Sequence, residues 1–136
     1  MNDKTIEQEI QAKGLTAPRI TPADLQANIA SVHYFTAGDG YAGAGSLTVE
    51  EGGTITPPDQ LDLLTFCVLI LRNGFTVTGE SACASPENFN AEIGRKIARQ
   101  NAEQKIWPLM GYELKERLFQ QALPDQGVAN GGVSHD

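Results

Sequence analysis

Cysteine and histidine, the residues from which metal sites and disulfide frameworks are built, are scarce in this chain of 136 residues. The two cysteines are Cys67 and Cys83, and the two histidines are His33 and His135. Two cysteines do not form a disulfide framework, and none of these residues has the short spacing of a zinc ligand set. We therefore expect two free cysteines that pack as small core residues, no metal site and no cofactor.

Positive charge is also scarce: ten lysines and arginines stand against 17 acidic residues, which leaves a net charge of -7. Proteins that bind duplex DNA normally carry a basic face, so we exclude duplex nucleic acid as a partner. The acidity is uneven, because residues 1–60 carry eight acidic and three basic side chains whereas residues 61–122 carry seven of each. The balanced part of the chain therefore remains open to a small phosphorylated ligand.

Long apolar runs and catalytic motifs are missing as well. No apolar run reaches the roughly 18 residues of a membrane span, and the N-terminus lacks the basic and apolar regions of a signal peptide. There is no phosphate-binding loop with its lysine and no nucleophile elbow, and we interpret Asp39, between two glycines, as a turn residue. The chain is too short for a doubly wound dinucleotide fold or a barrel. We expect a cytoplasmic protein that is not an enzyme.

Glycine and proline mark out a single domain. Residues 1–20 are polar, and we expect a flexible N-terminus there. A single α+β domain is predicted over residues 21–123, with a glycine-rich insertion at 37–60 that contains a short strand near residues 46–49. Residues 124–136 are predicted to be a disordered tail.

A hairpin is the clearest local signal. Asn73-Gly74 separates two apolar runs, and this dipeptide is typical of tight hairpin turns, whose two residues both need a positive φ. We predict strands over residues 64–72 and 75–82, and a small antiparallel sheet built on this 64–82 hairpin.

Three helices are predicted around that sheet. A capping threonine followed by proline begins an N-terminal helix over about residues 22–35, whose apolar residues recur at helical spacing. A long helix over about residues 87–107 ends at Pro108 and Gly111, and a second C-terminal helix covers about residues 112–123.

The long helix carries a stripe of small residues, Ala91, Gly94, Ala98 and Ala102. Such a stripe allows another backbone to approach closely, and its partner can be the sheet, the second helix or the same helix of a second subunit. A small chain with this much apolar surface is expected to form a homo-oligomer.

Two arginines of the same helix, Arg95 and Arg99, lie one turn apart. Stacked guanidinium groups suit a phosphate. The alternative is that both form ordinary ion pairs along the helix, Arg95 with Glu92 and Arg99 with Glu103.

Four aromatic residues near these elements could stack on a base: Phe75, Phe89, Tyr34 and Phe35. A phenylalanine beside a strand end or helix start is also commonly a core residue, so both interpretations stay open.

Several long motifs resemble a family of small tailed-phage proteins, the gene product 49 / gene 66 family. The resemblance covers about residues 61–119 with a further patch at 29–35, and leaves out residues 37–60 and both ends. The motifs are Arg72-Asn73-Gly74-Phe75-Thr76-Val77-Thr78-Gly79-Glu80-Ser81, Ile93-Gly94-Arg95-Lys96-Ile97-Ala98-Arg99-Gln100-Asn101-Ala102, Lys105-Ile106-Trp107 and Gly111-Tyr112-Glu113-Leu114.

The chain is also similar to the first-type Thoeris anti-defence sponges of phages, both in its size and in its order of a hairpin followed by a long helix. That resemblance implies a protein that binds a cyclic ADP-ribose isomer or a cyclic oligonucleotide without cleaving it, as a dimer or hexamer, in the cytoplasm of the infected bacterial host. It implies Arg95 and Arg99 as the phosphate-binding pair and Phe75 or Phe89 as the stacking residue. Further polar contacts would come from Asn88, Ser81 or Arg72.

Two other functions remain open. One is a protein–protein inhibitor or host-takeover factor that binds a host protein through the acidic N-terminal region and the 37–60 segment. The other is an enzyme of nucleotide metabolism.

Overall fold

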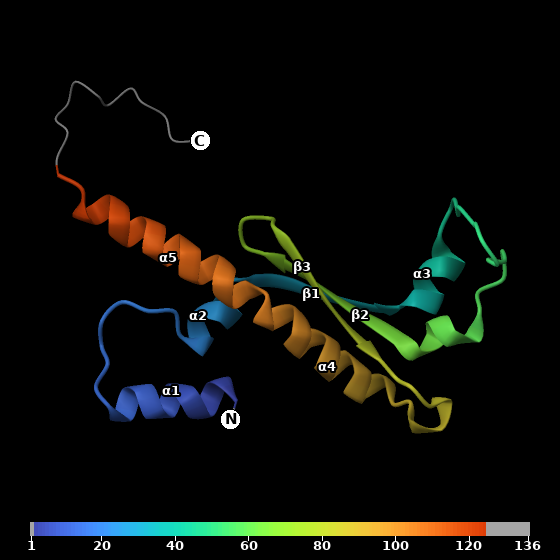
Figure 1. The fold of residues 1–136 in the computed structure, drawn as a ribbon, viewed down its shortest axis with the longest axis horizontal. Coiled ribbons are helices and arrows are strands. Elements are labelled where there is room, and N and C mark those ends of the chain that lie inside the picture. Colours follow the sequence, from blue (N-terminus) through green and yellow to red (C-terminus); the bar gives the residue numbers. More distant parts are fainter. Residues whose placement is uncertain (1, 125–136) are drawn as a thin grey trace, which may run out of the picture.

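Helices and a small antiparallel sheet make up the computed structural model, which describes residues 2–124 (Figure 1). The sheet has three strands, and a long bent helix crosses one of its faces. The predicted α+β class is therefore confirmed. The predicted disordered tail lies outside the described residues from residue 125 onwards, so its disorder stays a prediction.

Strands β2 (Leu64–Leu71) and β3 (Thr76–Ala82) form the predicted hairpin. Gly74 has a φ of 91°, a left-handed conformation that glycine adopts without steric cost. Asn73 has no positive φ, and its side-chain oxygen accepts a hydrogen bond of 2.9 Å from the amide of Phe75. The expectation of two positive φ values is wrong, because a longer turn with one left-handed glycine closes the hairpin.

Strand β1 (Ile29–Thr36) pairs antiparallel with β2 and occupies most of the segment predicted as a helix over 22–35. Helix α2 (Pro22–Ala27) ends after six residues. The strand places Val32 and Phe35 on opposite faces of the sheet, whereas helical spacing had grouped them. The helix prediction is wrong beyond α2, because this segment is rich in strand-forming residues and its backbone groups pair with β2.

Two short helices begin with the same reciprocal cap. In α2 the Thr21 hydroxyl accepts from the Asp24 amide, as the predicted cap requires. The Asp24 carboxylate also accepts from the Thr21 amide, a second bond that was not predicted. Thr36 and Asp39 make the same pair at the start of α3 (Ala37–Gly43). The interpretation of Asp39 as a turn residue is therefore corrected, since its carboxylate caps a helix.

The glycine-rich segment 37–60 is more ordered than expected, because α3 forms its beginning and the 3-10 helix η1 (Asp59–Leu63) forms at its end. The strand predicted near residues 46–49 does not form, and the sheet consists of β1, β2 and β3 within the described residues. Gly38 is buried, and a Cβ there would collide with the carboxylate of Asp62. This close contact joins α3 to η1 at the base of the intervening loop.

Helix α4 (Ala91–Gln104) packs its small-residue stripe on the sheet. Gly94, Ala98 and Ala102 are buried along it. Beneath them lies Gly79 of β3, where a Cβ would collide with backbone atoms of Ala98 and Ala102. The prediction that the stripe serves close packing is confirmed, and the sheet is its partner.

Helix α5 (Ile106–Ala122) follows α4 after a bend at Lys105 (Figure 1). Pro108 has no amide hydrogen, so the carbonyl of Gln104 lacks its usual helical donor. That missing bond accounts for the end of α4 at Gln104.

The predicted C-terminal helices need two boundary corrections. The helix predicted over 87–107 begins later, because the first of those residues belong to the 3-10 helix η2 (Pro86–Asn88). The helix predicted over 112–123 begins earlier, because Pro108 lies in the first turn of α5 and Gly111 in its second.

Helix α1 (Asp3–Ala12) occupies an N-terminal segment for which the sequence predicts no element. The carboxylate of Asp3 accepts a hydrogen bond of 3.1 Å from the indole of Trp107, and Glu7 holds Arg19 through two hydrogen bonds. Polar contacts thus hold α1 to the start of α5 and to the segment before α2. The expected flexibility of residues 1–20 stays a prediction.

Helix α4 crosses one face of the sheet (Figure 1), and apolar side chains of β2 line the opposite face. Phe66, Val68 and Ile70 of β2 are half-buried there, whereas the alternate residues beneath α4 are buried. The ring of Phe35 lies 5.6 Å from that of Phe66. We call these four residues the open sheet face. No helix among residues 2–124 has the length and apolar character that a bilayer crossing needs.

Candidate functional site

Arg95 has no ion pair or side-chain hydrogen bond within the described part of the chain. Glu92, the expected partner, forms its ion pair with Lys96 instead, at 3.3 Å. The predicted pairing of Glu92 with Arg95 is therefore wrong, and the Arg95 guanidinium keeps all its donors for another group.

Arg99 is held in a network between α4 and α2. Its Nε donates to Glu103 at 2.9 Å, and its terminal nitrogen donates to Gln26 at 3.1 Å. The amide of Gln26 in turn donates to Glu103. The hydrogen bond to Glu103 raises the pKa of the Arg99 guanidinium, and Tyr34 adds to that rise. The ion-pair alternative is confirmed for Arg99, so the two arginines differ in the contacts that they make.

Arg95 opens onto a small pocket of about 140 Å³ at the N-terminal end of α4, which we call the Arg95 pocket. The residues that line it with Arg95 are Tyr34, Phe35, Thr36, Asp39, Thr65, Phe89 and Ala91. Three of the four candidate aromatic residues thus meet at one arginine, although they come from β1 and from the segment before α4.

The chemistry of the Arg95 pocket favours an anion beside a flat ring. The free guanidinium and the positive end of the α4 dipole both attract negative charge. The carboxylate of Asp39 opposes this, but it already accepts a hydrogen bond from the amide of Thr36. Pockets that hold drug-sized ligands measure about 300–1,000 Å³, so the pocket of one chain has room for a phosphate or a ring but not for a whole nucleotide.

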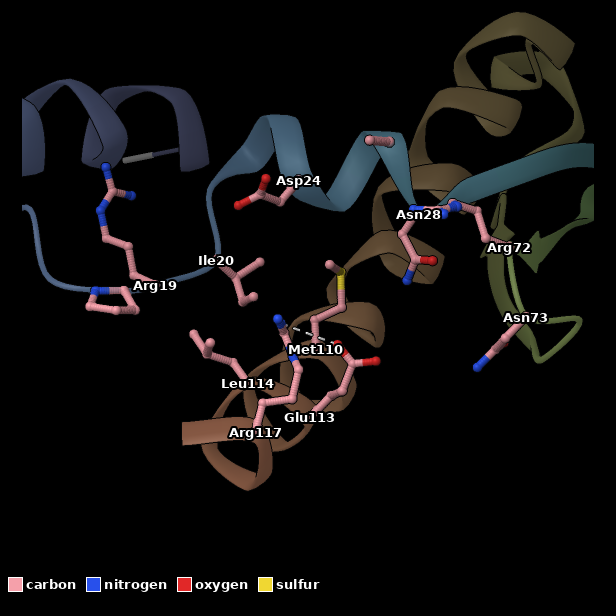
Figure 2. Close-up of a pocket in the computed structure, with 12 residues that line it drawn as sticks. Arg19, Ile20, Asp24, Asn28, Arg72, Asn73, Met110, Glu113, Leu114 and Arg117 are labelled. Atoms are coloured by element: carbon pink, nitrogen blue, oxygen red, sulfur yellow. Dashed lines mark ion pairs between the residues drawn. The ribbon is translucent and has the colours of Figure 1, made fainter. Parts of the chain in front are cut away.

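A larger cleft, of about 800 Å³, lies between α2, the β2–β3 turn and α5 (Figure 2). Arg19, Arg72 and Arg117 line it, from three segments far apart in the sequence. Its other lining residues are Pro18, Ile20, Asp24, Ala27, Asn28, Asn73, Met110, Glu113 and Leu114. We call it the arginine cleft. No sequence signal points to it, because only the fold brings these segments together.

The three arginines of the cleft differ in how firmly they are held. Arg19 is turned toward α1, where it forms hydrogen bonds of 2.5 and 2.8 Å with Glu7. Arg117 lies 3.4 Å from Glu113 in an exposed ion pair, and such pairs are weak. Arg72 has no side-chain partner among residues 2–124. Arg72 and Arg117 are therefore available to a ligand, whereas Arg19 has a structural role.

The phage protein (N4 Gp49/phage Sf6 gene 66) family model matches residues 20–118. The chain belongs to this phage family. The match includes the glycine-rich segment 37–60, which the sequence resemblance had left out. No curated protein and no solved structure matches the chain.

All seven predicted site residues lie within the part that matches the phage gp49/66 family. Arg95 and Phe89 meet at the Arg95 pocket, and exposed Asn88 lies next to Phe89 in η2. Ser81 of β3 pairs with Thr65, which lines that pocket.

The remaining predicted residues lie elsewhere. Arg72 lines the arginine cleft, and Phe75 lines a hollow of about 270 Å³ that shares residues with it. The hairpin turn that carries both residues is at the opposite end of β2 from the Arg95 pocket. The predicted set is therefore divided between two places.

The cysteines agree with the prediction of free thiols. Cys67 is buried beneath α4, and burial raises the pKa of its thiol. Cys83 is only half-buried, so the expectation that it packs in the core is wrong, and its thiol donates to the carbonyl of Ser85 at 3.1 Å. Within residues 2–124 no cluster of histidine, cysteine and carboxylate residues is arranged to hold a metal ion.

Proposed function

We propose that this phage protein binds a cyclic nucleotide immune signal, a cyclic ADP-ribose isomer or a cyclic oligonucleotide, and holds it without cleaving it. The observation that carries the proposal is Arg95, an arginine without a partner among the described residues that opens onto a pocket with three aromatic rings. The resemblance to the first-type Thoeris sponges supports the same ligand class.

In this proposal Arg95 binds a phosphate of the signal at the positive end of α4. A base stacks on Phe89 or Phe35, which flank the guanidinium. Arg99 acts indirectly, because its network with Glu103 holds α4 against α2 and so fixes the position of Arg95.

We propose that a second copy of the chain completes the site. The Arg95 pocket of one chain is smaller than a nucleotide, so the rest of the ligand needs another surface. Phe35 belongs both to that pocket and to the open sheet face. A subunit that covers the open sheet face would therefore reach the edge of the pocket.

We propose that the protein holds the signal and does not cleave it, because Asp39, the carboxylate that lines the Arg95 pocket, already caps a helix. Asp39 caps α3 through the amide of Thr36 and is not free to activate a nucleophile. A cyclic signal is therefore expected to be recovered intact after long incubation with the protein.

Calorimetry with cyclic ADP-ribose isomers and cyclic di- and trinucleotides tests the proposal. We expect micromolar or tighter binding of at least one of them, and a loss of about ten- to a hundredfold in affinity for Arg95→Ala. Lys96→Ala is the matched control, because it removes the neighbouring charge from the same helix outside the pocket. Absence of binding to all these ligands, or equal losses in the two variants, would overturn the proposal.

A second candidate function is inhibition of a host protein through the loop between α3 and η1. Its side chains include the acidic Glu50 and Glu51 and also Ile55, which is 83% exposed and therefore open to a partner surface. Replacing residues 45–57 by a short glycine–serine linker should abolish capture of a host protein and leave cyclic-nucleotide binding unchanged. The opposite result would favour the first function.

A further inference from the structure

We infer that the arginine cleft is a second ligand site, separate from the Arg95 pocket, for a small phosphate monoester that carries a flat ring. The cleft and the pocket share no lining residue. The inference therefore does not depend on the proposed function.

The anionic group is expected between Arg72 and Arg117. Arg72 comes from the hairpin turn and Arg117 from α5, so the two guanidinium groups approach the cleft from opposite sides (Figure 2). Arg72 is without a side-chain partner in the described chain. The pair of Arg117 with Glu113 is long and exposed, so Arg117 can exchange this carboxylate for a phosphate at little cost.

The charge of the two available arginines fits a phosphate monoester. Such a group carries about -1.5 to -2 at neutral pH, close to the combined charge of two guanidinium groups. Asp24 and Glu113 also line the cleft, and their carboxylates repel negative charge. A ligand therefore fits only if its negative charge is confined to the end that contacts the arginines. A ligand with charge spread over its whole surface would meet these carboxylates.

The rest of the cleft fits a flat, partly polar body. Ile20, Met110 and Leu114 give it an apolar wall, and the amide side chain of Asn28 lies near Arg72 (Figure 2). The volume of about 800 Å³ is within the range of sites for small ligands. The adjoining hollow, which shares Met110 with the cleft, adds the ring of Phe75 as a stacking surface.

Calorimetric titration of the full chain with adenosine monophosphate tests the inference, with inorganic phosphate and adenosine as partial probes. We expect one molecule bound per chain, and at least tenfold weaker binding of each partial probe. Arg72→Ala should weaken binding of adenosine monophosphate at least tenfold, and Arg72→Lys should weaken it less. Lys115→Ala, an exposed residue of α5 outside the cleft, is the matched control and should change nothing.

Three results would overturn the inference. They are the absence of binding at millimolar concentration, equal affinity of the Arg72→Ala variant, and displacement of adenosine monophosphate by a cyclic nucleotide bound through Arg95. The last result would place both ligands in one site and leave the proposed function standing. Loss of cyclic-nucleotide binding in Arg95→Ala with unchanged binding of adenosine monophosphate would support two separate sites.

Discussion

Gly79 is the residue at which strand β3 and helix α4 come closest. A Cβ there would collide with the carbonyl of Ala98 and the amide of Ala102, both of them backbone atoms in the middle of a helix. We expect Gly79→Ala to lower the free energy of unfolding by about 1–3 kcal/mol, because neither atom can move without bending α4. Urea denaturation measures this loss.

Gly111 offers the matched control for that substitution. It lies within α5, and nothing stands within 4 Å of the position of its missing Cβ. Gly111→Ala should raise stability by up to about 1 kcal/mol, since alanine is the better helix former. Equal effects of the two substitutions would contradict the close approach at Gly79.

Substitutions of the two arginines of α4 are expected to have different effects on the free energy of unfolding. Arg99→Ala removes the hydrogen bonds to Glu103 and Gln26 that join α4 to α2. We expect it to lower the free energy of unfolding by about 1 kcal/mol, a modest value because the network is partly exposed. Arg95 has no such bond within residues 2–124, so Arg95→Ala should stay within about 0.5 kcal/mol of the parent in the same denaturation experiment. A larger loss for Arg95→Ala would contradict its lack of a partner.

At the scale of elements, the docking of α1 is expected to depend on pH. The hydrogen bond from Arg19 holds the pKa of the Glu7 carboxyl below its ordinary value. Because this pKa is lowered in the folded chain, the Glu7–Arg19 pair stabilises the docking of α1 fully at neutral pH. That stabilisation is lost as the pH falls through the lowered pKa of Glu7, below the ordinary range of a glutamate. We therefore expect α1 to detach in acid before the sheet unfolds.

Trp107 is the one tryptophan of the chain and reports on this step, because its indole donates to Asp3 of α1. Its fluorescence should shift to longer wavelength as α1 detaches. In Glu7→Gln the shift should already be present at neutral pH and depend less on pH. An unchanged acid transition in that variant would assign the pH dependence to another group.

At the scale of the whole molecule, we expect a homo-oligomer that buries the open sheet face. Val68 lies in the middle of this face on the central strand. Val68→Lys should shift the chain toward the monomer in sedimentation experiments, because a buried ammonium in an interface costs more than the lost valine contacts. Gln100→Lys, an exposed change of equal charge on α4, should leave the assembly intact. Monomeric parent protein at micromolar concentration would rule out this assembly.

Short sequence patterns by themselves determine part of this structure. The Asn73-Gly74 dipeptide predicted the hairpin, and the capping threonine Thr21 followed by Pro22 predicted the start of α2. The small residues of α4 predicted a close backbone contact. Each of these features depends on neighbours within one turn or one hairpin, so the sequence alone carries it. The phage family likewise follows from the sequence.

Tertiary structure decided the features that depend on distant partners. Residues 29–36 form a strand because β2 offers them an unpaired edge, although their apolar spacing also fits a helix. The ion pair of Arg99 with Glu103 is local to α4, but the hydrogen bond that joins Arg99 to α2 exists only because the fold brings Gln26 beside it. The arginine cleft exists only in the fold, since Arg72 of the hairpin turn and Arg117 of α5 line one cleft only after these elements pack together. Residues that are far apart in the sequence give no local pattern from which such a contact can be predicted.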